Sequence, residues 1–448
     1  MRTYHADRRK HLSRDRKTKE RVVRPRENAL DSAAQNRQAT RPKVWSKSAQ
    51  RELTLLRLIH SNHNPSRIEL AKRTGASAGS VTAMVQRLIT RGLVIESGKG
   101  ATNSGRKPVS LSLRHDLAYV VGVDLGSFFS RVIITDILGS ICYRSEAETK
   151  MTEGREQVLS RTFRAIHTAI EQSQIPRGAI KGIGMAHSGV VDSQSGIVLC
   201  FPRPGQMTQW RNVPLRDMLE KEFGVPSLMD DSARMMAVAE KHFGLGRQVS
   251  DFLFIEVGMG IGASIFIDGR LYRGGGGGAG EFGHMTVNEN GPLCSCGNNG
   301  CLEAIASCAA LIQAVRDGIQ QGVNSKVSEL VDGDLDRISI EIIIRAARKN
   351  DTLALRVLDE GVSHIGVALA DVINLLNPGI VIFGGPLFRE GQELVLDRLR
   401  QVIRQRALEK SANEVQLKIS DLRSEAAALG AARLMSEEVL ERLYVGTI

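Results

Sequence analysis

Two hydrophobic periodicities divide the chain into a short first part and a long second part. Residues 48–60 carry apolar side chains at helical spacing, with Leu53, Leu56 and Ile59 on one face, which predicts an amphipathic helix. From Ala118 onward, apolar runs such as YVVGVDLG and GIVIFGGPL alternate with helical segments such as REQVLSRTFRAIHTAIEQSQ. This alternation predicts an α/β domain with two related lobes.

The residues after the first helix predict two more helices and a hairpin. Ser66 and Glu69 form a capping box, Gly75 ends the short helix that follows, and Ser77 caps the next one. Beyond that helix, the strand-like segments GLVIESG and VSLSL flank the basic, Gly-rich loop GKGATNSGRKP. Two short helices joined by a Gly-containing turn, followed by a hairpin, predict a winged helix-turn-helix.

This module is predicted to bind double-stranded DNA. Its last helix opens with small polar residues, which allows such a helix to enter the major groove. The residues predicted to face the DNA are Ser77, Gly79, Ser80, Thr82, Ala83 and Gln86. Those predicted to contact phosphates or the minor groove are Arg87, Arg106 and Lys107. A three-helix module with a hairpin can also be a protein-docking domain, and that alternative stays open.

Most of the net positive charge lies in the first 44 residues. The 448-residue chain has 60 Lys and Arg against 49 Asp and Glu, and residues 1–44 hold 14 of the basic and five of the acidic residues. A segment this basic and this poor in large apolar side chains predicts a disordered arm that is attracted to phosphate backbones. A solvated tail, or a start codon assigned too far upstream, accounts for the same composition.

The remaining composition indicates a folded, cytoplasmic protein. Hydrophobic residues make up 42% of the chain, which is enough for a core at this length. No window approaches the roughly 18 to 20 uninterrupted apolar residues of a membrane helix, and the first residues lack the apolar stretch of a secretory signal. Six cysteines are too few for a disulfide scaffold in a chain of this size.

One loop collects a histidine and three of the six cysteines. His284 is followed by Cys294, Cys296 and Cys301, and one imidazole with three thiolates is an ordinary tetrahedral ligand set for Zn²⁺. Because four protein ligands leave no open position, the set predicts a structural zinc. Three buried cysteines beside an incidental histidine are the alternative. The other cysteines are predicted to be core residues: Cys142, Cys200 and Cys308.

Two segments carry a resemblance to a known family: GAGEFGHMTVNENGPLCSCGNNGCLE and SRIELAKRTGASAGSVTAMVQRLITRGLVIESG. From Lys43 to its end, the chain resembles the ROK family of repressors, open reading frames and sugar kinases, in the regulator branch with an amino-terminal winged helix. The resemblance implies a two-lobed domain of the ribonuclease-H-like, actin-like ATPase class behind the winged helix-turn-helix. The expected organisation is a basic arm over 1–44, the winged helix-turn-helix over 45–115 and the ROK domain over 116–448.

Two loops that hold ATP phosphates in ROK kinases are altered in this chain. The kinase loops resemble DxGGTK and GTGIGGG. Here the first loop keeps Asp124 and Gly126 but has Phe128 where a threonine would approach phosphate, and the second has Met259 in place of a hydroxyl residue. Because a phosphate cradle needs backbone amides that side chains do not obstruct, both changes argue against ATP binding.

The catalytic segment of the kinases is altered as well. VPSLMDDSARMMAVAE aligns with the kinase pattern that ends in ENDANAAALAE, which places Asp231 at the first Asn and Ser232 at the catalytic Asp. A serine without a neighbouring base cannot take a proton from a sugar hydroxyl near pH 7. The chain is therefore predicted not to be an enzyme.

The resemblance nevertheless implies that a carbohydrate site is partly retained. Its expected ligand residues are Asp231, Glu281, His284 and Glu303. His284 can bind zinc with one ring nitrogen and a sugar hydroxyl with the other. An altered carbohydrate effector and a site kept only to support the zinc loop both fit these residues.

Three further features of this site have two interpretations each. Arg203 and Arg234 either recognise a phosphate or carboxylate on the effector or form ion pairs within the protein. The run Gly274–Gly278 is either a loop that closes over the ligand or a tolerated surface insertion.

Taken together, these features predict a sugar-responsive transcriptional repressor of carbohydrate metabolism genes. It is expected to bind a double-stranded DNA operator and a carbohydrate or sugar-phosphate effector, to hold a structural zinc, and to act as a homodimer or higher homo-oligomer. One alternative is an ATP-dependent sugar kinase with a DNA-binding domain, against which the absence of Asp at position 232 counts. The other is a regulator controlled by a protein partner.

Overall fold

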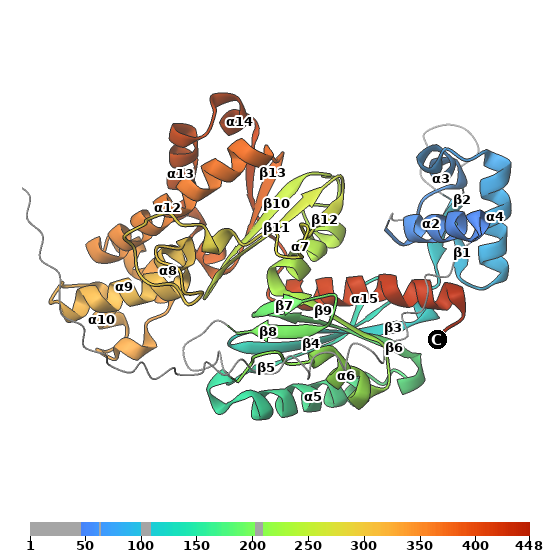
Figure 1. Ribbon diagram of the computed structural model, residues 1–448, viewed down its shortest axis with the longest axis horizontal. Helices are drawn as coiled ribbons and strands as arrows, with labels where there is room; N and C mark the ends of the chain where they lie inside the picture. Colours follow the sequence, from blue (N-terminus) through green and yellow to red (C-terminus); the bar gives the residue numbers. More distant parts are fainter. Residues whose placement is uncertain (1–45, 62–63, 100–108, 202–208) are drawn as a thin grey trace, which may run out of the picture. The chain divides into compact units, whose positions relative to one another are not determined.

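The amino-terminal part of the described chain is a three-helix module with a hairpin. The structure is a computed structural model that describes residues 46–61, 64–99, 109–201 and 209–448 (Figure 1). The predicted basic arm and the predicted contacts Arg106 and Lys107 lie outside these residues. The elements of the module are α2 (Lys47–Ser61), α3 (Arg67–Thr74), α4 (Ala78–Thr90), β1 (Val94–Lys99) and β2 (Val109–Leu113).

The capping signals in the sequence are confirmed. The Ser66 hydroxyl accepts from the Glu69 amide at 3.3 Å, and the Glu69 carboxylate accepts from the Ser66 amide at 2.7 Å. Ser77 caps α4 by accepting from the Ser80 amide, and Gly75 ends α3 in the left-handed conformation. The apolar residues of α2 and α4 form the core of the module, and β1 pairs antiparallel with β2.

Two polar residues of α2 are buried together with its apolar face, which the hydrophobic pattern does not predict. Glu52 and His60 are 7% and 8% exposed. The Glu52 carboxylate accepts from Arg87 Nε at 2.7 Å, so a charged partner on α4 compensates its burial.

The first lobe of the large domain is built on a five-stranded sheet in the order β5-β4-β3-β6-β9. Strands β3, β4 and β5 form an antiparallel meander, while β6 and β9 add in parallel. The apolar faces of α5 (Arg155–Gln172) and α6 (Leu215–Phe223) contribute to its core. Its strands, with the small hairpin β7–β8, are β3 (Tyr119–Leu125), β4 (Phe129–Asp136), β5 (Ile141–Glu148), β6 (Ile180–His187), β7 (Val190–Asp192), β8 (Ile197–Cys200) and β9 (Ser227–Asp231).

The second lobe repeats this topology in the order β12-β11-β10-β13-β14. Again three strands form an antiparallel meander and two add in parallel, which confirms the prediction of two related lobes. The strands are β10 (Phe252–Val257), β11 (Ile261–Ile267), β12 (Arg270–Tyr272), β13 (Ile380–Gly384) and β14 (Gln416–Ile419). The helices are α8 (Leu302–Ala306), α9 (Cys308–Gln320), α10 (Lys326–Leu330), α11 (Ile340–Arg348), α12 (Thr352–Leu376), α13 (Pro386–Arg406) and α14 (Glu409–Glu414).

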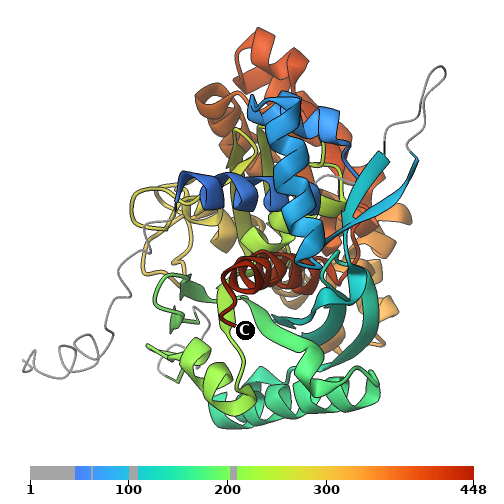
Figure 2. The same cartoon turned by 90° about the vertical axis from the view of Figure 1, so that its right-hand side faces the viewer.

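Two helices connect these parts, α7 (Ser232–Phe243) and the carboxy-terminal α15 (Ala426–Val445). Figures 1 and 2 show α15, in red, lying along the strands of the first lobe, and it contacts β3, β6 and α7. A Cβ atom on Gly184 of β6 would overlap the Ala431 carbonyl oxygen, and one on Gly430 would overlap the Met235 carbonyl oxygen of α7. Backbone therefore lies directly on backbone at both places.

Two findings concern the composition-based predictions. Within the described residues, none of the helices is long and apolar enough to cross a membrane.

The prediction that all three isolated cysteines are core residues is wrong for Cys142, which is exposed on the edge strand β5, and holds fully only for Cys308. Alternation along β5 places every second side chain toward solvent, and Cys142 occupies such a position.

Substitution of Gly184 should disrupt the packing of α15 on β6 and lower the stability of the protein. We expect Gly184→Ala to lower the unfolding midpoints in heat and urea, since a methyl group forced against backbone costs about 1–3 kcal/mol or more. Gly178→Ala is the control, because a Cβ there meets no atom within 4 Å. If the two variants unfold alike, the direct seating of α15 on β6 is refuted.

Candidate functional site

The four predicted metal ligands lie together in the second lobe. Their ligand atoms all fall within 4.8 Å of one another. The Sγ atoms of Cys296 and Cys301 are 3.7 Å apart, and so are Cys294 Sγ and His284 Nδ1. A tetrahedral zinc with ordinary Zn–S bonds would place two thiolates about 3.8 Å apart. The donor set and its spacing thus fit one tetrahedral ion.

Backbone hydrogen bonds hold the cysteine loop in this shape. The Cys294 amide donates to the Asn298 carbonyl at 2.7 Å, and the Gly297 amide donates back to the Cys294 carbonyl at 2.9 Å. Thr286 forms an isolated bridge with Cys301, which brings the segment after His284 beside the last cysteine. The ligands therefore meet because the loop folds back on the residues that follow His284.

The two ring nitrogens of His284 face different groups. Nδ1 points into the cysteine cluster, whereas Nε2 lies 4.0 Å from Glu281 Oε2. The side chain of Glu281 is 54% exposed. The face of His284 that is turned away from the cysteines is therefore shared with a carboxylate that is open to a ligand.

Asp231 ends β9 in the first lobe and precedes α7. Its Oδ1 caps the helix by accepting from the amides of Ala233 at 2.8 Å and Arg234 at 3.2 Å. Burial raises the pKa of the Asp231 carboxyl to about 6, Asp230 and Glu281 add to the rise, and Arg234 opposes it. The charge of Glu281, in the second lobe, thus contributes to the raised pKa of Asp231, in the first.

Glu303, the fourth predicted ligand residue, lies on α8 and contacts the start of β11. Its Oε2 accepts from the Ile261 amide at 2.9 Å, and a Cβ on Gly260 would lie next to that oxygen. The Leu302 amide donates to the Met285 carbonyl at 2.9 Å, which ties α8 to the residue after His284. One carboxylate oxygen of Glu303 is thus used by the protein itself.

Arg234 belongs to a buried ion cluster whose other members, Asp230 and Arg273, were not predicted from the sequence. Asp230, at the end of β9, is 1% exposed and accepts from Arg234 Nη1 at 3.2 Å and also from Arg273. Arg234 Nη2 donates to the carbonyls of Gly277 and Ala279 at 2.6 and 3.1 Å. Of the two interpretations of Arg234, the structure shows the internal ion pair, whereas Arg203 lies outside the described residues.

The cluster joins the two lobes. Asp230 belongs to the first sheet, and Arg273 directly follows β12 of the second. Arg273 Nη1 also donates to Ser193 Oγ at 3.3 Å, beside the β7–β8 hairpin of the first lobe. The only sequence signal for this role is the position of Arg273 immediately before the glycine run.

Comparison with known proteins places this arrangement in a family. The family model described as "ROK family" matches residues 120–438. The xylose repressor of Caldicellulosiruptor bescii is 34% identical over 390 residues, which cover 87% of this chain and 96% of that protein. The chain belongs to the ROK family.

Other ROK proteins are similar over comparable lengths. The DNA-binding transcriptional dual regulator NagC of Escherichia coli is 31% identical, covering 87% of this chain and 93% of NagC. A crystal structure of a ROK family transcriptional regulator, a homolog of the E. coli MLC protein, covers 89% of this chain with a TM-score of 0.72 and 27% identity. A Streptomyces griseus ROK glucokinase, solved with glucose and AMPPNP, covers 71% with a TM-score of 0.61 and 31% identity.

Arg131 contacts two residues of the segment that resembles the first ATP loop of the ROK kinases. Arg131 Nη1 lies 3.3 Å from Asp124 Oδ2, and its guanidinium lies 5.4 Å from the centre of the Phe129 ring. Burial raises the pKa of Asp124 to about 6, and Arg131 opposes this rise. Phe128 is 53% exposed at the tip of the loop. An ion pair and an exposed aromatic ring therefore occupy the segment that resembles the first ATP loop of the ROK kinases.

The predicted DNA-facing residues lie on one side of α4. Val81, Met84, Val85 and Leu88 are buried in the module. Apart from Ser80, which is half-buried, the described members of the predicted set are exposed: Ser77, Gly79, Thr82, Ala83, Gln86 and Arg87. Arg87 is held by Glu52, so part of its hydrogen-bonding capacity is already used.

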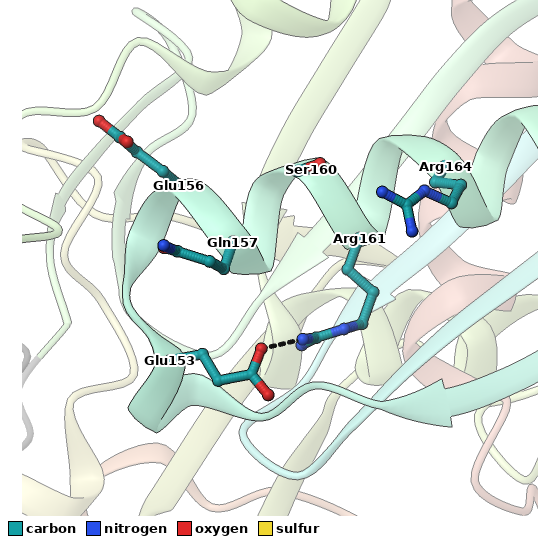
Figure 3. Close-up of a pocket in the computed structure, with 6 residues that line it drawn as sticks. All are labelled: Glu153, Glu156, Gln157, Ser160, Arg161 and Arg164. Carbon is teal, nitrogen blue, oxygen red and sulfur yellow. Dashed lines mark hydrogen bonds and ion pairs between the residues drawn. The ribbon is translucent and has the colours of Figure 1, made fainter.

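A surface hollow on the first lobe is unrelated to these groups (Figure 3). It is lined by Glu153, Glu156, Gln157, Ser160, Arg161 and Arg164. An ion pair between Arg161 and Glu153 crosses it, and none of its residues is a predicted ligand residue.

Loss of one thiolate should abolish metal binding in the cysteine loop. We expect Cys294→Ser to reduce bound zinc from about one ion per chain to nearly none and to lower the melting temperature, because a structural zinc contributes directly to folding. Metal analysis and thermal unfolding measure both effects. The exposed Cys142→Ser is the control. Unchanged zinc content in the Cys294 variant would contradict the assignment.

Proposed function

We propose that this ROK protein is a sugar-responsive transcriptional repressor of carbohydrate metabolism genes. The observation that carries the proposal is the length of the similarity to repressors. The xylose repressor aligns over 390 residues, which is longer than the 120–438 stretch of the ROK domain and so extends beyond that domain. The relatives thus share more than the lobes that sugar kinases also have.

In this proposal the three-helix module is a winged helix-turn-helix that binds an operator through α4. The exposed side of α4 offers small and polar side chains to the major groove, and its buried side anchors it to α2. Arg106, Lys107 and the basic arm over 1–44 would add contacts to phosphates. The proposed boundaries are 45–115 for this domain and 116–448 for the ROK domain.

The effector is a carbohydrate, with or without a phosphate, bound by Asp231, Glu281, His284 and Glu303. The arrangement in which Glu281 faces His284 Nε2 supports this role, since carboxylates and an imidazole nitrogen together can bind sugar hydroxyls. Zn²⁺ bound by His284 and the three cysteines would fix the orientation of that imidazole. Four protein ligands leave no open position, so this ion would be structural.

We further propose that the chain does not phosphorylate its sugar. Ser232 is buried, and its hydroxyl has no hydrogen-bond partner among the described residues. Asp231, the nearest carboxylate in sequence, has one oxygen committed to two backbone amides at the start of α7. Without a base at position 232, no side chain there can accept the proton of the sugar hydroxyl.

We also propose that the chain forms a homodimer, because the two-fold symmetry of a palindromic operator matches the two-fold symmetry of a dimer.

Selection of operator DNA tests the function directly. Sheared genomic DNA is selected on the purified protein, with and without xylose, glucose, N-acetylglucosamine and their phosphates, and each sugar is also assayed for ATP-dependent phosphorylation. We expect enrichment of a palindromic site that one sugar weakens, and no phosphorylation. DNA binding without sequence preference would overturn the proposal, and phosphoryl transfer would establish the kinase alternative.

Gln86 should read a base of that operator. We expect Gln86→Ala to weaken operator binding about tenfold, because a good bidentate base contact is worth about 1–3 kcal/mol, while binding to unrelated DNA stays the same. Thr90→Ala, also exposed on α4, is the control. Equal losses on operator and unrelated DNA would instead assign Gln86 to the phosphate backbone.

A further inference from the structure

The carboxy-terminal end of helix α15 contacts the amino-terminal module through Tyr444, and an ion pair between Arg57 of α2 and Glu441 of α15 lies near it in sequence. Tyr444 is 7% exposed, and its hydroxyl donates to Glu52 Oε2 at 3.0 Å. The other oxygen of Glu52 accepts from Arg87 Nε on α4 at 2.7 Å. One buried carboxylate thus connects the carboxy-terminal helix to the helix that is proposed to enter the DNA groove.

A second contact joins Tyr444 to the end of α4. Arg91, which caps α4, donates a hydrogen bond to the Tyr444 carbonyl. The same guanidinium lies 4.3 Å from the centre of the Tyr444 ring, within range of a cation–π interaction. Arg87 and Arg91 lie one helical turn apart. Tyr444 therefore contacts the last turn of α4 at two points, directly at Arg91 and through Glu52 at Arg87.

A third contact lies closer to the middle of α15. Arg433 is 3% exposed and donates to His60 Nδ1, at the end of α2, at 2.8 Å. Burial, with a smaller contribution from Arg433, lowers the pKa of His60 well below its usual value, so the ring is neutral and can accept this hydrogen bond. His60 Nε2 then carries the proton and donates it to the Ile137 carbonyl at 2.7 Å.

The other end of α15 contacts the helix that begins at the effector site. Gly430 lies directly on the Met235 carbonyl of α7, where no Cβ atom fits. Helix α7 begins at Ser232, and its cap is Asp231, a proposed effector ligand. Because close-packed backbones have no free space between them, a shift of α7 displaces α15 as well. From Gly430 to Tyr444 the helix spans about 21 Å.

We propose that α15 transmits effector binding to α4, and that Tyr444 is the positioning residue at the DNA-binding end of this connection. The inference rests on the proposed function of the chain as a sugar-responsive regulator. Effector contact with Asp231 and Glu281 would move the start of α7, and α15 would carry that movement to Glu52 and the last turn of α4. Tyr444 itself touches neither DNA nor effector in this scheme.

Tyr444→Phe tests the connection, because it removes only the hydroxyl that reaches Glu52 and keeps the ring beside Arg91. Operator affinity is measured in the full-length protein with and without xylose, and again with and without N-acetylglucosamine. Sugar affinity is measured by calorimetry with and without operator. Arg442→Gln is the matched control, since Arg442 pairs with Glu438 on the same helix.

We expect the variant to bind operator without sugar, and sugar without operator, within about threefold of wild type. The factor by which sugar changes operator affinity, typically about 5–150-fold in allosteric proteins, should fall several-fold in Tyr444→Phe and stay unchanged in Arg442→Gln. By linkage, the effect of operator on sugar affinity should fall by the same factor. A full wild-type response in Tyr444→Phe would overturn the inference.

Failure of the proposed function gives a different result. In that case the wild-type protein itself shows no sugar-dependent change in operator affinity with either sugar, and the connection through α15 falls with it. A responsive wild type with an equally responsive Tyr444 variant leaves the regulator proposal standing and removes only the role of Tyr444.

Discussion

The direct contact of the α15 backbone with β6 and α7 is the constraint on which the rest of this ROK protein depends. A sheet strand and two helices approach so closely that Gly184 and Gly430 leave no room for a methyl group. The first turns of α15 are buried almost completely, and alanine and glycine supply most of their residues. Small residues bury little side-chain surface, but they allow the backbones to approach closely. Close packing of these backbones makes the contact between the strands of the first lobe and the helix that follows Asp231 rigid.

Buried charge is handled by pairing in each part of the molecule. Asp230 forms ion pairs with two arginines, and Asp124 forms one with Arg131. Glu52 forms an ion pair with Arg87 and accepts a hydrogen bond from a tyrosine hydroxyl. An unpaired carboxylate at any of these places would cost several kcal/mol, so each pair restricts how its elements can be arranged. Two of the three pairs join elements far apart in the sequence. The pairs therefore contribute to the choice of one arrangement over others.

The two lobes have the fold of the ROK family and hold the residues proposed to bind zinc and the effector. The cysteine loop retains a complete ligand set with tetrahedral spacing, and Glu281 and His284 remain side by side. In the segment that resembles the first ATP loop of the kinases, Arg131 lies against Asp124, and Phe128 is exposed. In the proposed function, binding of sugar hydroxyls by carboxylates and an imidazole is sufficient for an effector site and needs no phosphoryl transfer.

The sequence by itself determined whatever depends on neighbours along the chain. Hydrophobic patterns predicted α2, α4 and β3, and the capping box at Ser66 followed from a four-residue pattern. The candidate metal ligands could be found because three of them lie within eight residues. Periodicity did not predict the burial of Glu52 and His60, since a polar residue on an apolar face reveals its partner only in three dimensions.

The tertiary structure decided the contacts between distant residues. Arg273 lies 43 positions from Asp230, and Tyr444 lies 392 positions from Glu52. No local pattern encodes such a pair, because the chain brings its members together only after sheets and helices have packed. The exposure of Cys142 was decided in the same way, by the place of β5 at the edge of its sheet. Local spacing specifies elements and loops, whereas charge pairs and backbone contacts across the fold depend on the packing of whole elements.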